Sequence, residues 1–69
     1  MVLSEVGDLI RKRRESFGMD RVHLAEMTGV AERTVFLLET GKGNPSFQTL
    51  ESVLNTLGME LVVRVKKSI

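Results

Sequence analysis

The stretch DRVHLAEMTGVAERTVFLLETGKGNP, residues 20–45, decides the architecture expected for this chain. Asp20 is a good N-cap for a short helix over residues 21–27, because its carboxylate can accept a backbone N–H bond. The Thr-Gly-Val tripeptide that follows predicts a tight break, since glycine adopts positive φ without a steric penalty. A second helix is expected over residues 31–39, and the Gly-Lys-Gly-Asn-Pro sequence after it predicts a sharp end.

Two further helices are expected to flank this pair. Ser4 is a fair N-cap for a helix over residues 4–17, which Gly18 terminates. Ser46 caps the last expected helix, over residues 47–57, in the same way. The side chains expected to face the core recur at helical spacing and are Val6, Ile10, Phe17, Leu24, Ala25, Thr28, Ala31, Val35, Leu38, Leu50, Val53, Leu54 and Leu57.

The chain after Gly58 changes from helical spacing to a period of two. Met59, Leu61, Val63 and Val65 alternate with Glu60, Val62, Arg64 and Lys66, and several of these residues are β-branched, which predicts a β-strand. A lone strand leaves its backbone groups unpaired, so we expect it to pair with the same strand of a second copy through Leu61, Val63 and Val65. Two-fold pairs are the commonest oligomers, which predicts a homodimer; a frayed tail in solution is the alternative.

Length and composition indicate one small unit. The expected organisation is a mainly α-helical domain at residues 1–58, followed by a dimerisation strand and tail at residues 59–69. With no Cys and one His, His23, the chain of 69 residues offers no multi-histidine or thiolate metal site, and no cofactor is expected. No apolar run reaches the roughly 18 residues of a membrane span. Acids precede the first basic run, unlike a signal peptide, and we expect a cytoplasmic protein.

The charge balance alone favours no particular partner. The net charge is +1, and residues 1–45 carry as many Asp and Glu as Lys and Arg. A nucleic-acid function must therefore depend on where the charges lie, because the chain has no overall basic character. The sequence shows no paired catalytic carboxylates, no nucleophile with a base and no phosphate-cradling glycine motif, so we expect no enzyme activity.

The two central helices match a helix-turn-helix unit, whose second helix enters the major groove of DNA. At about 100° per residue, the face of residues 31–39 opposite the core carries Arg33 and Leu37, flanked by Glu32 and Phe36. Arg33 can bind guanine through two hydrogen bonds, Glu32 can accept from a cytosine amine, and Leu37 can contact a thymine methyl. The adjacent Phe36 and Leu37 could instead form a protein-binding patch, and a solvated side chain is the alternative for Arg33.

The string GVAERTVFLLETGKGNP at residues 29–45 resembles the signature of lambda-repressor/Cro-like (XRE-type) domains. Residues 14–25 resemble the same family's junction between its first two helices, and the likeness extends over about residues 5–57. The loop at residues 41–45, followed by a helix and an alternating strand, is most similar to HipB-type antitoxins, whose C-terminal strands pair between subunits. The resemblance implies a four-helix lambda-repressor-like fold in a homodimer.

The resemblance also implies roles for single residues. Arg14 matches the Arg of the first helix that pairs with the Glu at the end of the recognition helix, here Glu39; such a pair fixes orientation more than it adds stability. Arg21 stands where the family usually has Gln, and we expect it to contact phosphate. Phosphate contacts are also implied for Thr34, Lys42 and Asn44. Base contacts are implied for Glu32, Arg33 and Leu37.

Two features depart from the family pattern. Ala31 replaces the usual Ser or Thr cap of the recognition helix, at a cost of about 1 kcal/mol. Phe36 and Leu37 stand where polar residues are usual, which leaves the choice between thymine contacts and a protein partner open.

The function expected from these observations is a dimeric transcriptional repressor on double-stranded DNA. Its two recognition helices would lie roughly 34 Å apart on a palindromic operator. The HipB-like features imply an antitoxin that represses its own operon and binds a HipA-like kinase toxin. Two alternatives stay open: a protein-interaction module that uses a helix-turn-helix scaffold without DNA, and a stand-alone phage-type repressor without a toxin.

Overall fold

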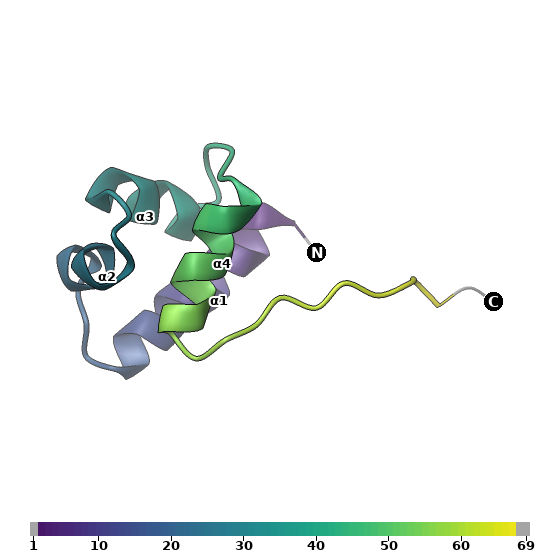
Figure 1. Ribbon diagram of the computed structural model, residues 1–69, viewed down its shortest axis with the longest axis horizontal. Coiled ribbons are helices and arrows are strands. Elements are labelled where there is room, and N and C mark those ends of the chain that lie inside the picture. Colours follow the sequence, from purple (N-terminus) through teal and green to yellow (C-terminus); the bar gives the residue numbers. More distant parts are fainter. Residues whose placement is uncertain (1, 68–69) are drawn as a thin grey trace.

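The computed structural model describes residues 2–67 and has four helices in this part of the chain (Figure 1). They are α1 (Leu3–Ser16), α2 (Arg21–Thr28), α3 (Glu32–Glu39) and α4 (Phe47–Thr56). The mainly helical, four-helix architecture is confirmed, and every helix end lies within one residue of its expected position. Met1 and residues 68–69, at the ends of the expected domain and tail, lie outside the described residues.

Two of the expected N-caps are confirmed. The Asp20 carboxylate accepts a hydrogen bond from the backbone N–H of His23 at 2.8 Å. The Ser46 hydroxyl accepts one from the backbone N–H of Thr49 at 3.1 Å. Each bond satisfies one of the backbone donors that the first turn of a helix leaves without a partner, so both helices start where the sequence predicts.

The start of α1 differs from the expected Ser4 cap, which is wrong. Val2 is the N-cap residue, and no side chain caps the helix there. Leu3, the first residue of α1, packs against the core, and burial of its side chain favours the earlier start. Ser4 lies inside the first turn, with its backbone against Gly41.

The core lies among the four helices. Its buried apolar residues are Ile10, Leu24, Ala25, Val35, Leu38, Val53, Leu54 and Leu57. Two expected core residues are exposed instead, which corrects the prediction. Phe17 is 52% exposed because it follows the last turn of α1, where the guanidinium of Arg13 lies 4.7 Å from its ring centroid. Ala31 is the extended N-cap residue of α3, so the angular spacing of a helix does not apply to it.

Two glycines allow α1 to approach α3 and the loop after it at backbone distance. A Cβ on Gly7 would overlap the carbonyl oxygen of Leu38 and lie 3.0 Å from backbone atoms of Glu39. A Cβ on Gly41 would lie 2.6 Å from the Cα of Ser4, and the φ of Gly41 is +72°. α1 therefore contacts the end of α3 at Gly7 and the loop after α3 at Gly41.

The segment after α4 is extended and leaves the helices, as the yellow-green trace in Figure 1 shows. The backbone N–H of Met59 donates to the carbonyl of Leu54 at 2.8 Å, which fixes the start of the segment. Val63 and Val65 are 87% and 95% exposed, and Leu61 is 41% exposed. The expected β-strand is not formed within residues 2–67, because this single chain offers its backbone no neighbouring strand.

No helix of the described part is both long and apolar enough to cross a membrane.

Candidate nucleic-acid interface

The turn between α2 and α3 is fixed by its own hydrogen bonds. Gly29 has a φ of 74°, and its backbone N–H donates to the carbonyl of Ala25 at 2.9 Å. The hydroxyl of Thr28 donates to the carbonyl of Leu24 at 2.9 Å and accepts from the N–H of Val30 at 3.2 Å. These hydrogen bonds hold the backbone of the turn that joins the two helices.

The outer face of α3 is open to solvent. Glu32 and Arg33 are exposed in its first turn, whereas Val35 and Leu38 on the opposite face are buried against the other helices. The salt bridges among the described residues involve α1, Arg21 and Glu39, and none includes Glu32 or Arg33. The first turn of α3 therefore presents a carboxylate and a guanidinium that are available to an external partner.

A small hollow of about 160 Å³ lies between α3 and the loop that follows it. Its lining includes four of the expected site residues, Thr34, Leu37, Lys42 and Asn44. The backbone N–H of Lys42 donates to the carbonyl of Leu37 at 2.9 Å, which folds the loop back onto the helix. The structure thus brings one expected base-contacting residue together with three expected phosphate-contacting residues.

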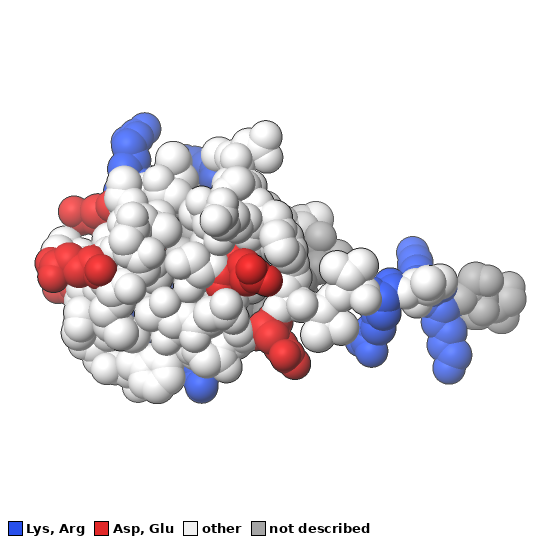
Figure 2. Space-filling model, in the orientation of Figure 1, with Lys and Arg blue, Asp and Glu red and all other residues white. Residues whose placement is uncertain are grey.

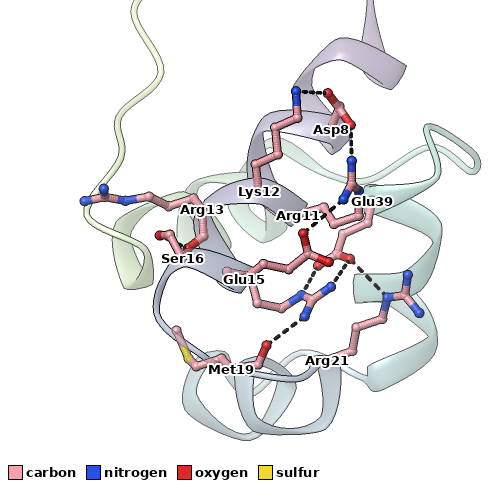
Figure 3. Close-up of polar contacts among 10 residues, drawn as sticks. Asp8, Arg11, Lys12, Arg13, Glu15, Ser16, Met19, Arg21 and Glu39 are labelled. Atoms are coloured by element: carbon pink, nitrogen blue, oxygen red, sulfur yellow. Dashed lines mark hydrogen bonds and ion pairs between the residues drawn. The ribbon is translucent and has the colours of Figure 1, made fainter.

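Arg14 and Glu39 form a buried, two-pronged ion pair between α1 and α3 (Figure 3). The Nε and Nη2 atoms of Arg14 donate to Glu39 at 2.6 and 2.9 Å, and its Nη1 donates to the carbonyl of Met19 at 2.7 Å. Burial raises the pKa of the Glu39 carboxyl, but hydrogen bonds from Arg14 and Arg21 outweigh it and hold that pKa below its ordinary value. The pair therefore stays ionised and ties the end of the recognition helix to α1.

Arg21 also bonds to Glu39. Its Nε donates to Oε1 of Glu39 at 3.0 Å, and its guanidinium lies 5.0 Å from the ring centroid of Phe36. The Arg21 side chain is 36% exposed, and its outer end points away from Glu39 in Figure 3. The residue expected to touch phosphate is thus anchored on α3, although it belongs to α2.

Phe36 and Leu37 contact different neighbours. Phe36 lies against Arg21, toward α2, whereas Leu37 lines the hollow beside the loop of Gly43 and Asn44. The two apolar side chains of the expected partner patch are therefore each engaged within the chain, and Phe36 remains 41% exposed.

Comparison with known proteins defines the family. A model of the helix-turn-helix family matches residues 10–63, from the middle of α1 into the extended C-terminal segment. The chain belongs to the helix-turn-helix family. This helix-turn-helix protein is 36% identical over 52 residues, 75% of each chain, to an uncharacterized HTH-type transcriptional regulator of Methanothermobacter thermautotrophicus. The expected helix-turn-helix family is confirmed, whereas the HipB-type subgroup stays a prediction.

The basic run RKRR of α1, residues 11–14, bonds to other residues of the helix-turn-helix domain. Arg11 bonds to Asp8 at 2.6 Å and to Glu15 at 3.0 Å. Arg13 donates from Nε to the carbonyl of Leu57 at 2.9 Å, at the end of α4. On the face that Figure 2 presents, basic side chains are scattered over the helices, and others gather along the extended C-terminal segment. The candidate interface of this helix-turn-helix protein therefore consists of individually positioned residues on α2, on α3 and in the loop after α3.

Sequence reasoning missed two residues and one contact that position α3 and α4. Gly7 permits the backbone contact of α1 with α3, and Arg13 caps α4. The missed contact is the hydrogen bond from Arg21 to Glu39. A glycine inside an otherwise helical stretch is the one signal that could have indicated the close approach at Gly7.

Proposed function

We propose that this helix-turn-helix protein is a sequence-specific DNA-binding transcriptional repressor. The observation that supports this most is the open first turn of α3, with Glu32 and Arg33 exposed while Val35 and Leu38 anchor its back. In a helix-turn-helix unit this turn is the part that meets base edges in the major groove. The relative described as a transcriptional regulator supports the same function.

The proposed contacts divide into two groups, because base contacts specify the sequence and phosphate contacts position the protein. Arg33 would bind guanine through two hydrogen bonds, Glu32 would accept from a cytosine amine, and Leu37 would contact a thymine methyl. The proposed phosphate-contacting residues are Arg21, Thr34, Lys42 and Asn44, three of which share the hollow beside α3.

A gel shift with the promoter upstream of the gene, at two salt concentrations, tests the function. Neutralisation of phosphates releases counterions, so affinity should fall steeply as salt rises. Arg33→Ala should lower discrimination between bases, and Lys42→Ala should weaken binding to all duplexes to the same extent. No binding at low salt, or binding that does not respond to salt, would contradict the proposal.

We also propose that the extended segment after α4 pairs with the same segment of a second copy. Three features support a homodimer: the alternation of Leu61, Val63 and Val65, their exposure in one chain, and an apolar hollow of about 190 Å³ between the segment and α1 and α4. Sedimentation of the full chain should give a dimer, and Val63→Asp should give a monomer. Lys66→Ala is the control, and a monomeric unmodified chain would refute the pairing.

The most specific function that we propose is that of the antitoxin in a HipBA-like operon. It depends on the resemblance carried by the loop at residues 41–45 and the segment after α4, and it implies repression of its own promoter and binding of a HipA-like kinase. Co-expression with the product of the adjacent reading frame tests it. A stable complex with a kinase-like protein supports the antitoxin, whereas a neighbourhood without such a gene favours a stand-alone repressor.

A further inference from the structure

Arg21 is held from two directions by residues of α3. Its Nε donates to Oε1 of Glu39 at 3.0 Å, and its guanidinium lies over the ring of Phe36, 5.0 Å from the centroid. Phe36 and Glu39 lie three residues apart on α3 and so project from nearby positions of the helix. The stem and one edge of the Arg21 side chain are therefore fixed in place.

The remaining edge of Arg21 faces outward. Of its three guanidinium nitrogens, only Nε bonds to a residue within 2–67. The outer end of the side chain points away from Glu39 in Figure 3. Two parallel N–H donors on one edge of a planar group match the geometry of two phosphate oxygens.

One carboxylate serves two guanidinium groups in the hydrogen-bonded network of Arg14, Arg21 and Glu39. Glu39 already accepts two hydrogen bonds from Arg14, and its side chain has no exposed surface. Arg14, Arg21 and Glu39 together carry one net positive charge, and Arg21 is the most exposed of the three. Arg21 is therefore the guanidinium of this network that reaches the surface, beside α3.

We propose that Phe36 and Glu39 are positioning residues that hold the guanidinium of Arg21, before DNA binds, in the orientation that contacts a DNA phosphate. This inference rests on the proposed DNA-binding function. A free arginine side chain loses considerable rotamer entropy when it is fixed at an interface, and the ring of Phe36 together with the carboxylate of Glu39 removes much of that loss in advance. The proposal also explains why an aromatic residue occupies position 36, where a polar one is usual.

Replacement of Phe36 by Leu tests the positioning directly, because leucine is apolar but offers no π face to the guanidinium. The full chain is titrated with its promoter duplex and with a scrambled duplex at several salt concentrations. Phe36→Leu should weaken binding to both duplexes about two- to fivefold, the range of an exposed cation–π contact. Phe36→Tyr should keep the affinity of the unmodified chain.

Arg21→Ala should weaken binding further and lower the salt slope by about 0.9, the value for one lost phosphate contact. In the Arg21→Ala background, Phe36→Leu should have no additional effect, because the guanidinium it positions is gone. Phe17→Leu is the matched control: Phe17 lies under Arg13 at 4.7 Å, away from α3, and its replacement should leave DNA affinity unchanged. Circular dichroism establishes that each variant is folded.

Each outcome decides between distinct conclusions. Equal losses from Phe36→Leu with and without Arg21 would show that Phe36 touches DNA itself, and an unchanged affinity in Phe36→Leu would show that it positions nothing; either result overturns the inference while the proposed function stands. Failure of the unmodified chain to bind DNA at low salt would overturn the proposed function and this inference with it.

Discussion

Gly7 on α1 and Leu38 on α3 are in backbone contact, and a Cβ on Gly7 would overlap the carbonyl oxygen of Leu38. Gly7→Ala should therefore force the recognition helix away from α1. Overpacking of this kind typically costs about 1–3 kcal/mol, and we expect the upper end because the neighbouring atoms are backbone. Urea unfolding measures the change in the free energy of unfolding.

Gly18→Ala is the contrasting variant for this prediction. Gly18 has a φ of +70° but open space around its Cβ position, so alanine there adds only a conformational cost of about 1–2 kcal/mol. Gly7→Ala should be the more destabilising of the two. The reverse order would mean that α1 and α3 separate easily, and that the close crossing is not a constraint on α3.

Loss of the Glu39 carboxylate should destabilise the protein strongly. Glu39→Ala leaves the guanidinium of Arg14 buried without its partner, which typically costs about 3–5 kcal/mol. Glu51→Ala, on the exposed side of α4, is the control and should change the free energy of unfolding by less than about 0.5 kcal/mol. The midpoints of thermal unfolding distinguish the two variants, and similar midpoints would contradict a structural role for the ion pair of Arg14 and Glu39.

The same carboxylate gives stability a pH dependence. The pKa of Glu39 is lower in the folded protein than its ordinary value of 4.5, so the unfolded chain binds the proton more readily. The stabilisation is complete above about pH 4.5 and is lost as pH falls through the lower folded pKa. Urea unfolding between pH 7 and pH 3 should show this loss in the unmodified chain and a smaller one in Glu39→Gln. An equal dependence of the free energy of unfolding on pH in both proteins would show that Glu39 is not its source.

An N-cap for the recognition helix should stabilise the fold. Ala31 is the extended N-cap residue of α3, and it makes no side-chain hydrogen bond. Ala31→Ser supplies a hydroxyl for the free backbone donors of the first turn and should add about 1 kcal/mol. Ala31→Val cannot accept such a bond and should add nothing. A thermal midpoint unchanged by serine would show that water already satisfies these donors.

The helices were predictable because their signals are local. Asp20 and Ser46 cap α2 and α4 as expected, since an N-cap bond depends only on residues three positions away. Phe17 and Ala31 were misplaced because both lie just outside a helix, where the angular spacing of core residues no longer applies. Ser4 was misjudged because burial of the neighbouring leucine prevails over a polar cap.

The interface was less predictable because it depends on contacts between distant residues. The bond between Arg21 and Glu39 spans 18 positions and requires α2 and α3 to be placed first. Periodicity also cannot show that Phe36 lies against Arg21 and Leu37 against the following loop. The strand expected from the alternation near Val63 needs a partner that one chain does not contain.

The proposed function requires the exposed first turn of α3 to read a DNA sequence. Selection of bound sequences from a random duplex library by the full chain measures this preference. We predict enrichment of a two-fold symmetric site with half-sites one helical turn apart, and loss of preference at one base pair per half-site in Arg33→Ala. A library that stays random after selection, or an enriched site that Arg33→Ala leaves unchanged, would contradict the proposed role of α3.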